Sequence, residues 1–205
     1  RGPAQFNFYQ PPACGWSVMA GFSESSTVQA WLVQRLVGLG WDHVPGDFGK
    51  WLPSAKSVPR ESTDVLVQEW LLEALEILNP ELHGYPERID EVLPVIRSAV
   101  LSTTTDGLVA ANERMVTLLR GDYTHKYVGT DEYVPLRLID FDHLENNTYV
   151  VSEEVSIGPE GHRRRFDIVL WVNGIPLVVI ETKTPVKASV SWLNGARDID
   201  RTYTV

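Results

Sequence analysis

Residues 162–183 read HRRRFDIVLWVNGIPLVVIETK, and they carry the clearest structural signal in the sequence. Two apolar, β-branched runs, Ile168 to Val172 and Leu177 to Ile180, flank the pair Asn173-Gly174. An Asn-Gly pair between such runs is the strongest short-range signal for a β-hairpin. The sequence therefore predicts a buried hairpin around which the other elements are arranged.

Charged residues bracket the hairpin. Asp167 precedes the first run, and Glu181 and Lys183 follow the second, where an unpaired charge would be costly to bury. Because side chains alternate along a strand, Glu181 and Lys183 point to the same face. A strict two-residue turn would place Asp167 opposite Ile180 and on the other face. We therefore predict an odd-numbered loop or one β-bulge between Asp167 and Glu181.

These residue types indicate a metal site. Two converging carboxylates suit Mg²⁺, which binds one or two protein carboxylates and keeps several waters. The backbone carbonyl of Thr182 is a further candidate ligand. Such an ion polarises a phosphodiester, and Lys183 can offset charge that builds on the phosphate. The set Asp167, Glu181 and Lys183 thus predicts phosphodiester hydrolysis. The alternative is a surface ion pair at a strand end beside a turn-capping Asp167.

Composition limits the class of protein. The chain has 205 residues, 43% of them apolar and seven of them Trp, enough for one large or two small domains with a real core. Its net charge of -9 argues against broad basic nucleic-acid binding, so any DNA contact is local or assisted. The single Cys14 fits a reducing compartment. With no apolar run near the ~20 residues of a membrane helix, we expect a soluble cytoplasmic protein.

Periodicity divides the chain into a helical part and a strand-rich part. Residues 1–22 form an irregular N-terminal arm, and a single domain spans 23–205, helical over about 23–121 and carrying the hairpin core over about 136–205. Apolar spacing predicts helices at about 28–39, 64–78 (capped by Thr63), 88–101 (kinked or restarted at Pro94), 107–119 and 190–203, strands at 136–141, 148–157, 164–172 and 177–183, and a long loop at 42–61. Trp31, Trp70 and Trp171 are expected in the core.

A longer run carries a family resemblance. Asp167, thirteen residues, then Glu181-Thr182-Lys183 looks like the D…ExK signature of the PD-(D/E)XK nucleases. The surrounding sequence from Arg165 to Pro185 resembles the N-terminal endonuclease domain of the R subunit of type I restriction enzymes, where an Asn-Gly-Ile/Leu-Pro-Leu turn lies between the acids. The similarity extends loosely to Ser23-Glu24, Gly40-Trp41, Leu78-Asn79-Pro80 and Glu145-Asn146-Asn147.

This resemblance implies a fold and an activity. The fold would be of the mixed α/β class (α+β), a restriction-endonuclease-like core with a central mixed β-sheet flanked by helices. Asp167 and Glu181 would bind Mg²⁺ and Lys183 would be the catalytic lysine of a type I site-specific deoxyribonuclease that cuts double-stranded DNA. The whole enzyme would use ATP and assemble with specificity and methyltransferase subunits, which would recognise the DNA sequence.

The resemblance also implies that the 205 residues are a fragment. They hold no phosphate-binding loop of the ATP-dependent kind, and they stop before the last strand expected of such a core. We expect this piece to be inactive alone. One departure concerns the helix after the lysine, where many members carry Gln-x-x-x-Tyr. Tyr203 is present, but Ile199 stands four residues before it.

Other residues are candidates for DNA or metal contact. Most protein hydrogen bonds to DNA go to phosphate and sugar, so cations near the site could bind phosphates or only be solvated. Glu24 could supply a further acid, as first-helix acids often do in PD-(D/E)XK enzymes, or favour the helix N-terminus. The DNA-contact candidates are Arg163, Arg164, Arg165, Lys187 and Tyr203. The five His residues have no ligand spacing, so no zinc site is predicted.

Two other functions stay open on the sequence alone. One keeps the fold without the activity, as a DNA-guiding or subunit-docking module whose site has decayed. The other is a different PD-(D/E)XK enzyme, such as a repair nuclease.

Overall fold

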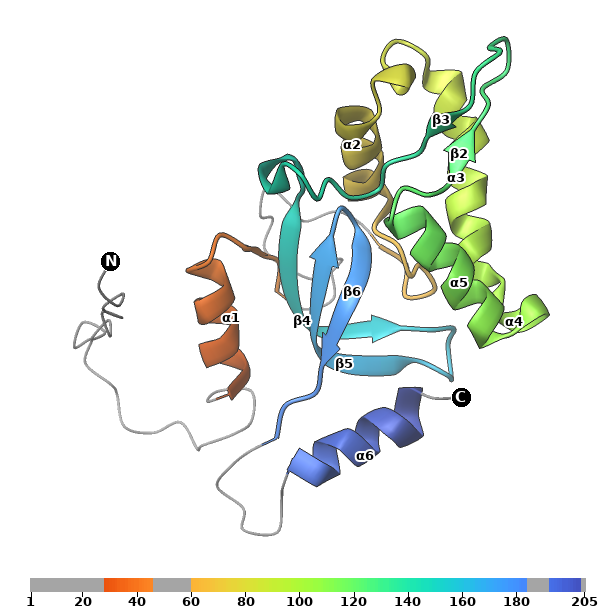
Figure 1. The fold of residues 1–205 in the computed structure, drawn as a ribbon. Helices are drawn as coiled ribbons and strands as arrows, with labels where there is room; N and C mark the ends of the chain where they lie inside the picture. Colours follow the sequence, from red (N-terminus) through yellow and green to blue (C-terminus); the bar gives the residue numbers. More distant parts are fainter. Residues whose placement is uncertain (1–27, 46–59, 184–191, 204–205) are drawn as a thin grey trace, which may run out of the picture.

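The computed structural model describes residues 28–45, 60–183 and 192–203, and it confirms the mixed α/β class (Figure 1). The arm predicted at 1–22 lies outside these residues. The helices are α1 (Ala30–Val37), α2 (Gln68–Leu78), α3 (Pro86–Leu101), α4 (Thr103–Asp106), α5 (Leu108–Leu119) and α6 (Trp192–Tyr203), with 3₁₀ turns at Pro80–Leu82 and Leu144–Asn146. The strands are β1 (Asp42–His43), β2 (Thr124–His125), β3 (Val134–Pro135), β4 (Tyr149–Ile157), β5 (Arg164–Val172) and β6 (Ile175–Ile180).

The main sheet is mixed. Its strand order is β1-β4-β5-β6, with β1 parallel to β4 and the other neighbours antiparallel. β1 lies at the start of the segment predicted as a loop, so that prediction is wrong at Asp42–His43, and residues 46–59 lie outside the described chain. β2 and β3 form a separate antiparallel pair.

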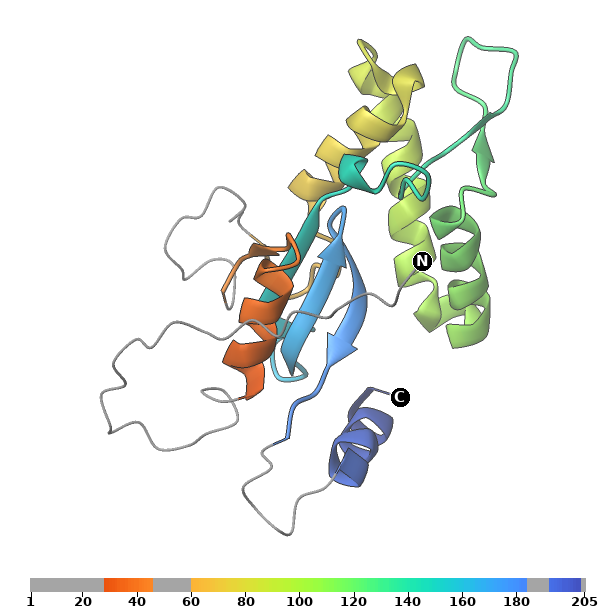
Figure 2. The same ribbon diagram turned by 60° about the vertical axis from the view of Figure 1, so that its left-hand side comes forward.

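Helices lie on both faces of the main sheet. α1 packs on one face, where Val33 contacts Val151 and Ile168 (Figures 1 and 2). On the other face Trp70 of α2 meets Trp171 of β5 edge to face, with ring centroids 6.3 Å apart. Both rings are buried, as predicted. Trp31 is instead 63% exposed, because the part of α1 that faces the sheet is built from other residues, including Val33.

A second core holds the helical layer together. Residues of α2, α3 and α5 pack there against the segment 127–138 and against Ile175 at the hairpin turn, and the buried members are Leu71, Leu75, Leu82, Val92, Ile96, Ala99, Leu118, Tyr127, Leu136, Leu138 and Ile175. α3 continues through Pro94 as one helix of 16 residues. The helical layer therefore contacts the hairpin at its turn and leaves its other end for the site.

The hairpin has the predicted irregularity. Val172 pairs with Ile175 and Trp171 with Pro176 around the turn at Asn173 and Gly174, both of which have positive φ (52° and 76°), as a type I′ turn requires. The next pair is Leu170 with Val178, so Leu177 is an extra residue on β6. This bulge confirms the register prediction.

β6 is less buried than expected. β5 is largely enclosed, but Leu177, Val178 and Val179 are 40%, 44% and 38% exposed. Among the described residues β6 is an edge strand, with β5 as its neighbour on one side. The prediction of a hairpin buried along both strands is therefore wrong for β6.

Two other boundaries differ from the sequence prediction. α2 begins at Gln68 and Thr63 does not cap it, because the preceding chain is tied to the hairpins: the Val67 amide donates to the Gly174 carbonyl (2.8 Å) and the Gly158 amide to the Ser62 carbonyl (2.7 Å). Residues 103–106, just before the helix predicted at 107–119, form the short helix α4, which is followed by Gly107 with φ 84°.

The strand predicted at 136–141 is wrong. Leu136 and Leu138 are buried as a strand pattern would have them, but side chains satisfy the backbone there. Asn79 accepts from the Arg137 amide (2.8 Å) and donates to its carbonyl (2.9 Å), and Asn147 accepts from the Asp140 amide (2.9 Å). Asparagine side chains thus replace a strand partner for this segment.

Asn173 connects the hairpin turn to that segment and is fully buried. Its Nδ2 donates to the Leu138 carbonyl and to Asn147 Oδ1 (both 2.8 Å), and its Oδ1 accepts from the Thr148 amide (2.8 Å). We expect Asn173→Ala to lower the free energy of unfolding by about 3 kcal/mol, since it leaves buried groups unpaired and places alanine at positive φ. Urea-induced unfolding measures this loss.

Two variants make the Asn173 measurement specific. Asn173→Gly keeps the backbone freedom but loses the hydrogen bonds, so it separates the two contributions. Asn112→Ala removes an exposed asparagine of α5 and should change the stability by less than about 0.5 kcal/mol. Equal effects of Asn112→Ala and Asn173→Ala would contradict the prediction.

Candidate active site

The hairpin register brings Asp167 level with Glu181. The last register pair of β5 and β6 joins Ile168 and Ile180, and the next position on each strand is Asp167 on one and Glu181 on the other. Glu181 lies one residue past the end of β6, so the strand is shorter than the predicted 177–183. The bulge at Leu177 sets this register, because without it Asp167 would face Ile180.

Thr182 fixes the Asp167 carboxylate. Its amide and its hydroxyl both donate to Asp167 Oδ2, at 2.7 and 2.8 Å. Thr182 is buried (4% exposed), so this oxygen is held by two donors from a rigid, dry position. Asp167 Oδ1 stays outside these two bonds and is the oxygen that can face an ion. Whether the Thr182 carbonyl is a ligand stays a prediction.

Lys183 lies between two carboxylates. Its Nζ donates to Glu181 Oε1 (2.8 Å) and forms an ion pair with Asp198 Oδ2 of α6 (3.1 Å). The Lys183 and Glu181 side chains are mostly covered, with 22% and 14% exposure, whereas Asp198 is half exposed. α6 packs closely on this side chain, since a Cβ at Gly195 would lie 3.5 Å from Lys183 Cγ, an ordinary contact distance. The contact confirms that Glu181 and Lys183 lie on one side.

The two carboxylates keep Lys183 charged. Desolvation lowers the pKa of Lys183, but the hydrogen bonds to Glu181 and Asp198 outweigh it and raise that pKa above its ordinary value. Lys183 is therefore a fixed cation at neutral pH. It can stabilise negative charge on a phosphate and cannot serve as a general base in this state.

The donor set fits Mg²⁺. In the described ranges no three His, Cys, Asp or Glu side chains gather closely enough to hold a metal by themselves. Mg²⁺ does not need such a cage, since it binds through one or two carboxylates together with water and substrate phosphate. Asp167 and Glu181 are the two carboxylates that would hold such an ion, and the ammonium of Lys183 lies 2.8 Å from Glu181 Oε1.

The other predicted site residues are not all gathered here. Arg163 and Arg164 are exposed at the start of β5, and Arg165 forms an ion pair with Glu154 at 2.9 Å. Tyr203 ends α6, and its side chain is not described. Glu24 and Lys187 lie outside the described residues.

Sequence reasoning missed two contacts of this site. Asp198 reaches Lys183 only because α6 packs beside the hairpin end, and no local pattern predicts that packing. The side chain of Thr182 was also missed, although a hydroxyl residue between an acid and a lysine at a strand end could have indicated it.

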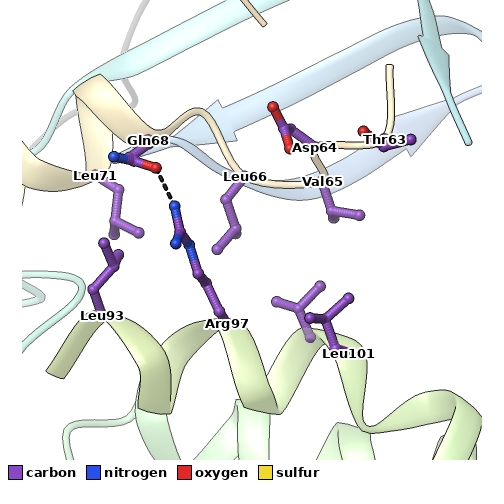
Figure 3. Close-up of a pocket in the computed structure, with 10 residues that line it drawn as sticks. Thr63, Asp64, Val65, Leu66, Gln68, Leu71, Leu93, Arg97 and Leu101 are labelled. Atoms are coloured by element: carbon purple, nitrogen blue, oxygen red, sulfur yellow. Dashed lines mark hydrogen bonds between the residues drawn. The ribbon is translucent and has the colours of Figure 1, made fainter. Parts of the chain in front are cut away.

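A hollow of about 310 Å³ lies elsewhere, between α3 and the segment that leads into α2 (Figure 3). Arg97 of α3 reaches across it and donates to Gln68. Leu66, Leu71 and Leu93 line its apolar wall. It shares no residue with the carboxylate site, and its cation already has a partner.

The candidate site is thus a β-hairpin with two acids and a lysine at its open end. The sequence profile of the family described as "Type I restriction enzyme R protein N terminus" matches residues 21–204. The chain belongs to this family.

Individual relatives agree with the family match. The chain is 36% identical over 168 residues to the type I restriction enzyme HindI endonuclease subunit of Haemophilus influenzae, covering 80% of this chain and 15% of that protein. It is 26% identical over 171 residues to the putative MjaIXP endonuclease subunit of Methanocaldococcus jannaschii (81% and 16%) and 24% identical over 170 residues to the EcoprrI endonuclease subunit of Escherichia coli (82% and 46%). The chain thus spans less than half the length of each of these relatives.

None of the helices in the described part of the chain is both long enough and apolar enough to cross a membrane.

Proposed function

We propose that this chain is the nuclease domain of a type I restriction enzyme R subunit, with a PD-(D/E)XK core that hydrolyses phosphodiester bonds of double-stranded DNA with Mg²⁺. The observation that carries the proposal is the register of β5 and β6. The bulge at Leu177 sets Asp167 level with Glu181, and Lys183 bonds to Glu181 at 2.8 Å. The names of the relatives, which are restriction enzyme endonuclease subunits, support the same reading.

Each residue has a distinct part in this proposal. Asp167 and Glu181 would hold the ion, which supplies Lewis-acid polarisation of the phosphodiester when bound. Thr182 keeps Asp167 Oδ2 in place through its two donated bonds, so the carboxylate is oriented before the ion arrives. Lys183, which its carboxylate partners keep charged, would stabilise the negative charge that grows on the phosphate as water attacks phosphorus.

The acidic composition fits a subunit that is brought to DNA by partners. With a net charge of -9, the chain does not present an overall basic surface. We propose that specificity and methyltransferase subunits recognise the DNA sequence in a cytoplasmic complex, and that ATP hydrolysis in other parts of the R subunit moves the DNA. The exposed arginines at 163–165 would then give local phosphate contacts.

Metal binding tests the site directly. We expect calorimetric titration of the chain with Mg²⁺ to give saturable binding that Glu181→Ala lowers by about tenfold or more, because one of two ligating carboxylates is lost. The matched control is Glu160→Ala, which removes an exposed acid from the turn at 158–161. Equal affinity of the Glu181→Ala protein and the parent would refute the proposed ligand.

A further inference from the structure

Glu154 is the irregular position of β4. Of residues 149–157, it alone has no Cα partner in the ladder with β5, although Glu153 and Val155 on either side pair with Ile168 and Phe166. The register places Asp167 opposite the gap. Glu154 has φ 55°, a conformation that a residue with a side chain rarely adopts. The distortion thus lies on the strand next to the proposed metal ligand.

Two contacts hold the Glu154 side chain. Gln29, which is buried beside α1, donates from Nε2 to Glu154 Oε1 at 3.2 Å. Arg165 of β5 pairs through Nε with Glu154 Oε2 at 2.9 Å. The carboxylate is therefore bound on one oxygen by the interior of the fold and on the other by an arginine whose side chain is 70% exposed.

This arrangement orients the arginine. The 2.9 Å contact is made by Nε of Arg165, and the guanidinium carries four further N–H donors on its two Nη groups. Arg165 and Asp167 are two residues apart on β5, with Cα atoms about 7 Å apart, so the two residues are close along the strand. A guanidinium held in this way presents a preformed fork to an anion, and DNA phosphate is the anion that the proposed reaction requires.

Stability alone does not account for Glu154. An exposed ion pair stabilises a protein little, and less than a positive φ at a residue with a Cβ destabilises it. Strained residues of this kind cluster where a function requires them. The neighbouring Glu153 has ordinary pairing in the ladder and lies near His43, with 3.6 Å between its Oε2 and His43 Nε2, which shows that an acid on this strand does not need the strained conformation.

We propose that Glu154 is a positioning residue that holds Arg165 so that its Nη groups bind a backbone phosphate of DNA beside Asp167. The inference rests on the proposed nuclease function and deepens it, because it assigns a phosphate contact on β5 and the residues that orient it. Gln29 anchors Glu154, Glu154 anchors Arg165, and Arg165 contacts the DNA.

Binding of a DNA duplex to the full-length protein tests the proposal, measured by fluorescence anisotropy over a range of NaCl concentrations in EDTA so that no strand is cut. Glu154→Gly deletes the carboxylate and tolerates positive φ. We expect it to weaken binding about fivefold at moderate salt, and to lower the slope of log affinity against log salt by about 0.9, the amount for one lost phosphate contact. Arg165→Ala should do the same, and the double variant should lose no more than Arg165→Ala alone.

The opposite result has a distinct meaning. If Glu154 only neutralises Arg165, Glu154→Gly frees a cation and binding becomes tighter with a steeper salt slope, which overturns the proposal. Unchanged affinity and slope in Arg165→Ala overturn it as well. Glu160→Gly is the charge-matched control in the exposed turn between β4 and β5 and should not weaken binding. If Glu154→Gly lowers the thermal midpoint, Glu154→Asn, which also tolerates positive φ, gives the same test.

The test separates this proposal from the function beneath it. If Asp167→Asn abolishes cleavage but substitution of Glu154 and Arg165 leaves DNA binding unchanged, only the positioning role of Glu154 is refuted. Cleavage that does not depend on Asp167 removes the proposed function itself.

Discussion

Replacing Asp167 by Asn in the complete enzyme is expected to lower DNA cleavage about 1000-fold or more, because loss of one ligand charge removes several kcal/mol of transition-state stabilisation. The substitution is nearly isosteric, and the amide oxygen of asparagine can still accept from the Thr182 amide and hydroxyl, which now donate at 2.7 and 2.8 Å. The local structure should therefore persist while the charge is lost. Conversion of supercoiled circular DNA to nicked and linear forms, with Mg²⁺ and ATP present, measures the effect.

Two controls tie that loss to the chemistry. Glu160→Gln also removes one acidic charge, from an exposed turn, and should cleave at the parent rate. ATP hydrolysis by the Asp167→Asn enzyme should be unchanged, since the proposed site has no part in it. Parent-level cleavage by Asp167→Asn would show that the carboxylates at the hairpin end are not the nuclease site.

Gly174→Ala is expected to be the most destabilising single change in the hairpin. A Cβ at residue 174 would lie 2.3 Å from the Val67 carbonyl oxygen and 2.9 Å from the Leu71 amide nitrogen, which are backbone atoms that cannot rotate away. The φ of +76° adds the usual penalty for a side chain in that region. We expect a loss of about 4 kcal/mol in the free energy of unfolding, or failure to fold, measured by urea denaturation.

Gly84→Ala isolates the part of this cost that comes from φ. Gly84 has φ +78°, almost the same as Gly174, but a Cβ there would have no atom within 4 Å. It should cost about 1 kcal/mol. The difference between the two variants then measures the contact between the hairpin turn and the start of α2, and equal losses would show that this contact is not tight.

The sequence predicted the register of the hairpin better than the structure around it, for a physical reason. The limits of β5 and the bulge between the acids follow from alternation along a strand and from the need to bring Asp167 and Glu181 together, both of which are local. The family match over residues 21–204 confirms the resemblance read from the same stretch. The ligand and catalytic roles of these residues stay predictions.

Long-range contacts account for what the sequence did not predict. Leu136 and Leu138 alternate like a strand, but Asn79 satisfies the adjoining backbone at Arg137, and an asparagine 58 residues away leaves no local signal. Trp31 has helical spacing, yet the face of α1 that meets the sheet excludes it. Asp198 meets Lys183 only through the packing of α6. Tertiary contacts decided each of these cases.

With the extra residue at Leu177, Asp167 and Glu181 are level only when the number of residues between them is odd, as the present thirteen are. One residue added to or removed from the turn would exchange the inward and outward side chains of β6 past that point, and would send Glu181 to the opposite face from Asp167 unless the bulge were lost at the same time. Two residues added together would lengthen the loop and keep both acids on one side. Natural or engineered length variation in this hairpin should therefore come in steps of two, or as a single step that erases the bulge.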